Sequence, residues 1–152
     1  MVKIKQEHLE QLKKQINKNL PDVSCGAILG YTSDGITLIH SLLELENEQC
    51  EKRENRYLIT PQQYMKAEET AENTNLELIG FYYSRTGGLA PGELDVKYAF
   101  PGFLYLAVSN KENKIKASGW ILAETRKSFF NQDIEIITTE ENILSHKMAI
   151  AV

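Results

Sequence analysis

Hydrophobic and polar positions along this chain show two patterns, one helical and one typical of strands. Residues 3–19 read as one helix, in which Leu9, Leu12, Ile16 and the following Leu20 recur at the spacing of one face, while lysine and glutamine occupy most of the other positions. Pro21 should end this helix, since proline cannot continue the backbone hydrogen-bond ladder. This first stretch therefore predicts an amphipathic helix.

Short apolar runs bounded by turn residues predict strands elsewhere in the chain. These runs are residues 25–31, 36–42, 56–60, 76–83, 103–109, 115–122 and 133–138. A second helix should begin at Thr60-Pro61, an N-cap residue followed by proline at the first helical position, and continue to about Asn75. A weak helical turn is expected at 93–99, and the tail 139–152 is expected to be helical near Glu140.

Two helices and this set of strands predict an α/β fold of the α+β type. We expect a mixed central β-sheet of about 6–7 strands flanked by helices. No internal repeat or linker divides the chain, so residues 1–152 should form a single domain.

Composition narrows the function classes. The net charge of −4 and the scattered basic residues argue against nucleic-acid binding. No apolar run approaches the roughly 20 residues needed to span a bilayer, so no membrane partner is expected. The N-terminus lacks the apolar core of a signal peptide, which makes a cytoplasmic location the expectation.

The cysteines and histidines show no metal-type spacing. Cys25 and Cys50 stand far apart, and Cys25 at the start of an apolar run is expected to be a buried free thiol. His8, His40 and His146 are also widely separated, and His8 is expected on the surface of the first helix. None of these residues forms an evident nucleophile or metal constellation.

The run from Gly80 to Asp95 is the most distinctive stretch, because a strand leads directly into a Ser/Gly/Pro loop that ends in aspartate. With the apolar strand that follows at 103–109, this order resembles the JAMM/MPN family of zinc isopeptidases. In that family the loop reads His-Ser-His-Pro, a spacer, then Pro-Ser-x-x-Asp. Here Ser84, Pro91 and Asp95 match.

The resemblance extends over roughly residues 3–136 and is closest to the small bacterial members. Residues 21–30 are similar to the family's opening, Pro-x-Glu-x-Cys-Gly-x-Leu-x-Gly, with Val23 at the position of the catalytic glutamate. Asn47 and the segment 57–61 also fall where family members carry an Asn and a strand before a proline-started helix.

The residues that carry the family's chemistry are replaced. Tyr83 and Arg85 stand at the two histidine positions, and Gly92 stands at the serine position. A tyrosine phenol is protonated at neutral pH and a guanidinium is always cationic, so neither suits zinc. Only Asp95 matches a family ligand, and Val23 cannot transfer a proton.

The resemblance therefore implies a pseudoenzyme with no catalytic residue, no bound metal and no cofactor, although zinc would be expected of the family. Its vestigial pocket would comprise Val23, Tyr83, Ser84, Arg85, Gly92 and Asp95. Arg85 either pairs with Asp95 where zinc would sit or points to solvent.

Relatives in this family hold the extended tail of a ubiquitin-like or sulfur-carrier protein beside a strand, and they pair with other MPN domains. The resemblance thus implies a protein-binding or scaffold module for such a partner, with a homodimer as a further possibility. Two alternatives stay open. One is a zinc-dependent metallopeptidase or isopeptidase with a non-standard site, and the other is a small-molecule binder that reuses the emptied pocket with Arg85 as an anion anchor.

Overall fold

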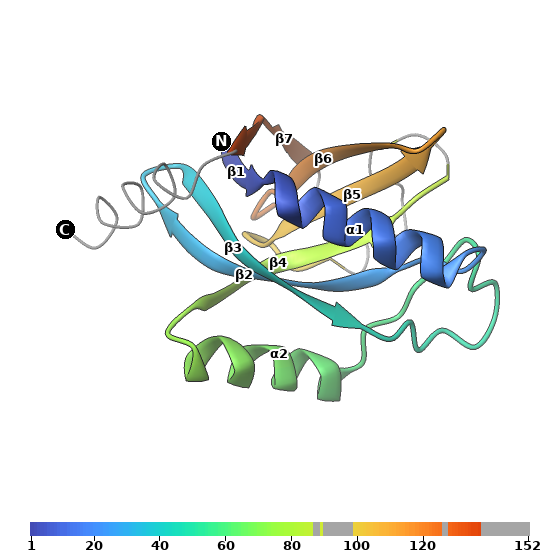
Figure 1. Cartoon of the computed structure of the whole chain (residues 1–152). Helices are drawn as coiled ribbons and strands as arrows, with labels where there is room; N and C mark the ends of the chain where they lie inside the picture. Colours follow the sequence, from blue (N-terminus) through green and yellow to red (C-terminus); the bar gives the residue numbers. More distant parts are fainter. Residues whose placement is uncertain (87–88, 90–98, 126–127, 138–152) are drawn as a thin grey trace.

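The computed structural model describes residues 1–86, 89, 99–125 and 128–137 (Figure 1). These residues form β1 (Val2–Lys5), α1 (Gln6–Asn19), β2 (Cys25–Ser33), β3 (Ile36–Leu45), α2 (Pro61–Asn73), β4 (Glu77–Ser84), β5 (Leu104–Lys111), β6 (Lys114–Leu122), β7 (Phe129–Gln132) and β8 (Ile134–Ile137). Neither α1 nor α2 is long and apolar enough to cross a membrane. The helical tail expected at 139–152, and all but the last residue of the turn expected at 93–99, lie outside the described residues.

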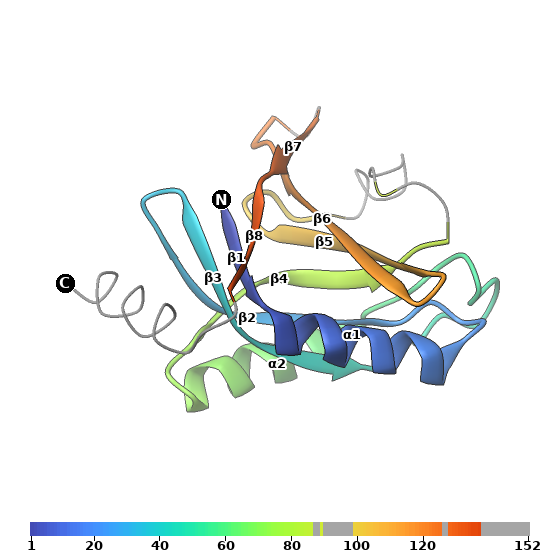
Figure 2. The ribbon, with the colours of Figure 1, turned by 45° about the horizontal axis from the view of Figure 1, so that its top comes forward.

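All eight strands belong to one mixed sheet in the order β7-β6-β5-β4-β2-β3-β1-β8. The pairs β4–β5, β1–β3 and β1–β8 are parallel, and the remaining pairs are antiparallel. The first and last strands of this order, β7 and β8, are consecutive in the chain with only Asp133 between them. The backbone N–H of Val2 donates to the Asp133 carbonyl (2.7 Å). The two ends of the sheet thus meet, and the sheet curls into a nearly closed barrel (Figure 2).

This architecture corrects the predicted fold. A helix-flanked, MPN/JAMM-like sheet of about 6–7 strands is wrong, because the described residues form an eight-stranded, barrel-like sheet with two helices. The N-terminal strand β1 was missed because the predicted helix began at residue 3 and included Ile4, yet Val2 and Ile4 are both buried with the alternation of a strand. Residues 56–60 were predicted as a strand and are not one. The single strand predicted at 133–138 corresponds to β8, and β7 precedes it.

Helix α1 covers one face of the curled sheet. Leu9, Leu12 and Ile16 on its inner side are nearly inaccessible to solvent and join a core cluster with strand residues such as Ile28 and Leu106. Removing apolar surface from water is the main favourable term in folding, at roughly 25 cal/mol per Å². Three residues of the predicted stripe therefore form the inner side of α1, whereas Leu20 lies beyond the last turn and is exposed.

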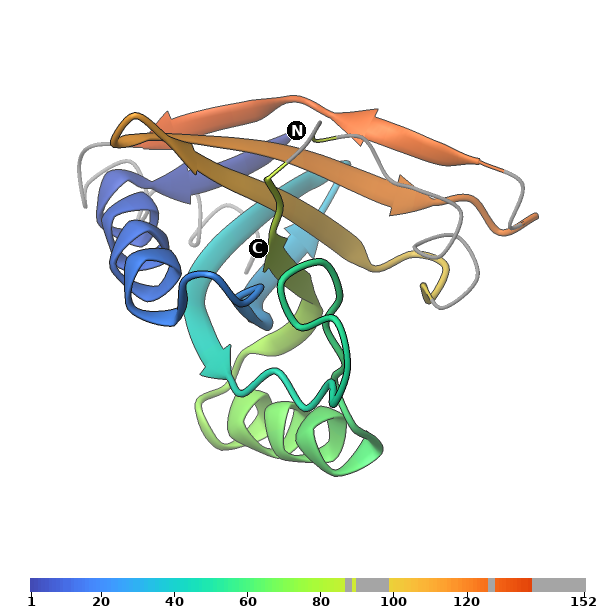
Figure 3. The same cartoon turned by 90° about the vertical axis from the view of Figure 1, so that its right-hand side faces the viewer.

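Helix α2 lies on the other side of the sheet (Figure 3). It begins as predicted at Thr60, whose Oγ1 accepts from the Gln63 backbone N–H (3.2 Å), while the Gln63 side chain accepts from the Thr60 N–H (2.9 Å). Only Ala67 and Ala71 of this helix are buried. Ala67 joins a cluster that is rich in small and aromatic side chains. Ala71 packs with Leu29 and Leu76.

The parallel pairing of β4 with β5 depends on a glycine. A Cβ atom at Gly80 would lie 1.9 Å from the backbone carbonyl oxygen of Leu104, far inside van der Waals contact. Gly80 pairs with Leu104, so any side chain there would separate the two strands at the start of their ladder. This pairing fixes the end of β4 beside Val108, where the candidate site lies.

Candidate functional site

The structure brings two of the predicted site segments together. Cys25 pairs with Tyr83 at the start of β2, and the neighbouring residues Ser24 and Ser84 are joined by two hydrogen bonds. The Ser24 N–H donates to Ser84 Oγ (2.8 Å), and the Ser84 N–H donates to the Ser24 carbonyl (2.9 Å). Val23, one residue before Ser24, therefore lies next to the end of β4.

The side chains at these positions belong to the core. Val23 is 8% exposed and Tyr83 is 3% exposed. The Tyr83 ring stacks on Tyr57 with centroids 4.9 Å apart and planes inclined by 16°, an arrangement that adds dispersion and quadrupole attraction to burial. Where the resemblance would place a zinc ligand and a proton-transferring glutamate, the chain thus places a packed aromatic and a packed aliphatic side chain.

The structure describes Arg85 but not every residue of the predicted pocket. Arg85 is half-buried, and its backbone N–H donates to the Val108 carbonyl (2.8 Å), which extends the β4–β5 ladder by one residue. Gly92 and Asp95 lie outside the described residues, and so does the expected pair between Arg85 and Asp95.

Asn47 organises the loop that covers this end of the sheet. Its buried amide Nδ2 donates to the carbonyls of Val23 (3.2 Å) and Arg56 (2.9 Å), and its Oδ1 accepts from the N–H groups of Gln49 and Leu58 (3.1 Å each). All the hydrogen-bonding capacity of one amide is used. The sequence singled out Asn47 only by family resemblance, and its role as the hub of this loop was missed.

The Cys25 thiol beside the site is not activated for chemistry. Cys25 is a buried free thiol, as predicted, and desolvation together with the charge of Glu48 raises its pKa to about 12. It is therefore a thiol rather than a reactive thiolate at neutral pH. Among the described residues, no group of three or more His, Cys, Asp and Glu side chains is arranged to hold a metal ion.

The expectation for His8 was wrong. Its side chain is 5% exposed and lies between α1 and β3, where Nε2 donates to the His40 carbonyl (3.1 Å) and Nδ1 accepts from the Lys5 N–H (3.4 Å). Burial and then the charge of Lys5 lower its pKa below the usual value. His8 is therefore a neutral structural residue at the start of α1.

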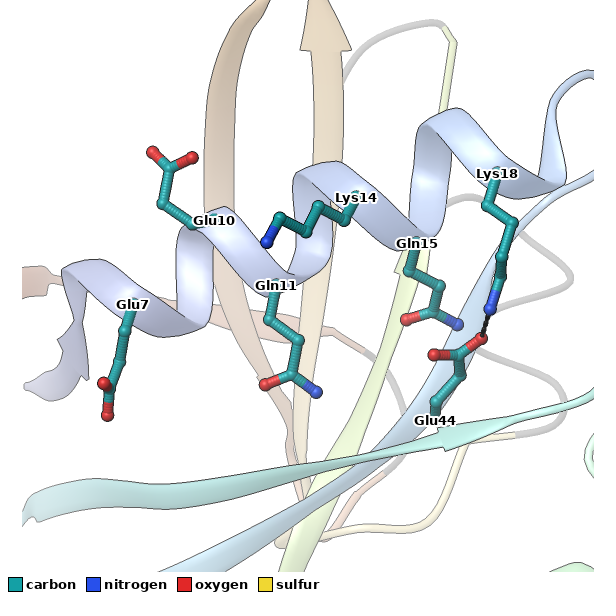
Figure 4. Close-up of a pocket in the computed structure, with 7 residues that line it drawn as sticks. All are labelled: Glu7, Glu10, Gln11, Lys14, Gln15, Lys18 and Glu44. Carbon is teal, nitrogen blue, oxygen red and sulfur yellow. Dashed lines mark hydrogen bonds and ion pairs between the residues drawn. The ribbon is translucent and has the colours of Figure 1, made fainter.

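A polar groove of about 500 Å³ lies elsewhere, between α1 and the second half of β3 (Figure 4). Gln11 Nε2 donates to the Leu42 carbonyl (3.2 Å) and Gln15 Nε2 donates to the Cys25 carbonyl (3.0 Å). Lys18 and Glu44 form an ion pair across the groove (2.6 Å). Gln11 and Gln15 thus bond the sheet and Lys18 and Glu44 bond each other, and none of the lining residues belongs to the predicted pocket.

Comparisons with known proteins show the fold. No protein-family model matches the chain, and no curated protein matches it. A protein from Desulfitobacterium hafniense, solved in solution, superposes with a TM-score of 0.80 at 17% sequence identity, over 93% of this chain and 97% of that one. A solution structure of a protein from Salinibacter ruber gives a TM-score of 0.67 at 29% identity, over 92% and 94% of the two chains. Both are structural-genomics targets described by organism alone, and they establish the architecture without indicating an activity.

Proposed function

We propose that this protein is a non-catalytic protein-binding module. The observation that carries the proposal is the packing of Val23 and Tyr83, whose side chains are buried and, for Tyr83, stacked on Tyr57. A hydrolytic zinc site needs about three ligands around an open coordination position. Two of the positions that would supply such a site contribute instead to the core.

Exposed aromatic surface on the same side of the sheet supports a binding role. Phe100 is 53% exposed and contacts Tyr64 and Phe103, with ring centroids 5.8 and 6.0 Å apart. Through Tyr64 and Phe81 this surface continues into the cluster that contains Tyr83. Exposed aromatic groups beside a core are the usual anchors of protein interfaces.

The partner that we propose is the extended tail of a ubiquitin-like or sulfur-carrier protein, or another MPN domain, as the resemblance of residues 80–95 implies. An extended tail binds a strand through backbone hydrogen bonds, which need no metal. The protein should therefore bind the tail without cleaving it.

The first experiment is elemental analysis of protein purified without chelator and then incubated with zinc. We expect zinc well below one ion per chain. Stoichiometric, tightly held zinc would overturn the proposal, because it would require ligands that replace the missing histidines.

A second experiment tests affinity and cleavage together. Backbone amide NMR signals of the protein are followed while a sulfur-carrier protein with an intact tail is added, and the tail is then weighed by mass spectrometry. We expect shifts for residues near Ser84 and Phe100 with the tail intact. A shortened tail would show an enzyme, and an unperturbed spectrum would exclude this partner. The same carrier with its tail deleted is the matched control.

A further inference from the structure

Among the described residues, strand β6 has no second strand partner over half its length. Its neighbour β7 pairs with it only from Gly119 to Leu122. From Lys114 to Ser118, β5 is the only strand paired with β6 among the described residues. A two-residue turn joins β5 to β6, and Lys111 and Lys114 face each other on either side of it. Because hydrogen-bonded and non-bonded pairs alternate along the hairpin, the backbone N–H and C=O groups of Ile115 and Ala117 point away from β5. An extended chain could bond these groups.

The same half of β6 carries a set of lysines on one face. Lys111 faces Lys114 directly across the hairpin, and Lys116 follows two residues later on the same side of the strand. All three side chains are exposed, and within the described part of the chain none of them forms an ion pair. Glu112 is the one acidic residue in this hairpin turn. Like charges that face each other across strands are destabilising, so this arrangement does not serve the hairpin itself.

We propose that an extended, acidic segment of a partner protein adds to the open edge of β6, with alternate carboxylates on Lys114 and Lys116. Residues two apart on a strand are about 6.8 Å apart, which is the spacing of alternate side chains in the added segment. On the opposite face, Ile115 and Ala117 pack against the apolar core, so the intervening residues of the segment meet a less polar surface. Main-chain bonds give the affinity in this mode, and the lysines select the charge.

This edge lies at the same end of the sheet as the vestigial pocket. Arg85 is bonded to Val108, and Val108 pairs with Ala117 of β6. The inference rests on the proposed binding function and names the chemistry of the segment that would be held. A tail that crosses from the end of β4 to β6 would need to span two strand spacings, about 10 Å.

Lysines on an open strand edge have a simpler role, which is to prevent edge-to-edge aggregation. Reversal of their charge separates the two explanations. The double variant Lys114→Glu/Lys116→Glu keeps a charged edge. If the lysines only protect the edge, this variant should stay monomeric and bind an acidic peptide as the parent protein does. Strand addition of an acidic segment predicts loss of binding.

The test uses a capped peptide of alternating Glu and Thr residues as the probe, with binding followed by calorimetry and amide NMR on the full chain. We expect binding, slowed hydrogen exchange at the Ile115 and Ala117 amides, and an affinity loss of about tenfold or more in the double variant. The matched control is Lys66→Glu, an exposed lysine on α2, which should bind like the parent protein.

Two further probes make the outcome decisive. A peptide of alternating Glu and Pro has the same charge but lacks backbone donors at every second position, so equal binding of this peptide would overturn strand addition. Tighter binding of oligothymidylate than of the Glu-Thr peptide would assign the lysines to nucleic acid and overturn the proposal. Failure of the Glu-Thr peptide to bind zinc-free protein would refute this inference alone, because the proposed function is judged by zinc content and by the carrier-tail experiment.

Discussion

The two helices lie on opposite faces of one sheet and are attached to it in very different ways. Helix α1 buries Leu9, Leu12 and Ile16 in the main aliphatic cluster, and it also donates side-chain hydrogen bonds to sheet carbonyls. Helix α2 buries two alanines, and its Tyr64 ring lies against Phe81 and Phe103, with ring centroids 5.9 and 6.2 Å apart. The comparison indicates that α1 completes the interior of the nearly closed barrel, whereas α2 rests on its outside.

The candidate site lies on the face of the sheet that α2 covers, and the packing on this face differs from the packing under α1. The cluster there is rich in small and aromatic residues, and several of the aromatic side chains are half-exposed, such as Tyr57 and Phe103. A region with fewer large aliphatic contacts has a lower cost of local opening. A binding surface is therefore better placed beneath α2 than beneath α1.

The largest expected effect is on the α1 side. Leu12 is 1% exposed in the middle of the helix, so Leu12→Ala should lower the free energy of unfolding by about 2–5 kcal/mol through lost burial and a residual cavity. Chemical denaturation followed by circular dichroism measures this. Met65→Ala on α2 is the control, since Met65 is 68% exposed and its removal should change stability by less than about 0.5 kcal/mol. Equal losses in the two variants would contradict the distinction between the helices.

Local signals in the sequence predicted part of this fold and missed the rest. The start of α2 was correct because Thr60, Pro61 and Gln63 act on one another within a single turn. Closure of the barrel was missed because it depends on Val2 pairing with Thr37 and with Ile134, partners that no local pattern connects. Long-range pairing of this kind is decided by tertiary packing rather than by periodicity.

The candidate site was predictable to a similar degree. The strand before the loop was predicted, and the structure places Val23 beside Ser84. The stack of Tyr83 on Tyr57 was not foreseen, because it joins a strand to a loop that the sequence pattern assigned to another strand. The hub role of Asn47 was hidden for the same reason, since its four partners come from three separate stretches of chain.

A smaller effect is expected at the start of α2. Thr60→Ala removes the hydroxyl that accepts from the Gln63 N–H and should destabilise the protein by about 1 kcal/mol. Thr60→Ser keeps the acceptor and should restore most of this loss. Thermal unfolding of the three proteins measures both changes. If Thr60→Ala cost as much as Leu12→Ala, α2 would be as deeply integrated as α1, and the comparison would fail.

The smallest effect concerns pH and belongs to the first turn of α1. The pKa of His8 is lowered in the folded protein, first by burial and then by the charge of Lys5, from an ordinary value of 6.5. The unfolded chain therefore binds a proton more readily, so the contribution of neutral His8 is complete above pH 6.5 and is lost as pH falls below it towards the folded pKa. His8→Gln keeps a donor for the His40 carbonyl but cannot titrate. The stability of the parent protein should fall more steeply than that of His8→Gln on acidification below 6.5, as measured by denaturation across this range. Parallel curves would show that protonation of His8 does not disturb the attachment of α1 to β3.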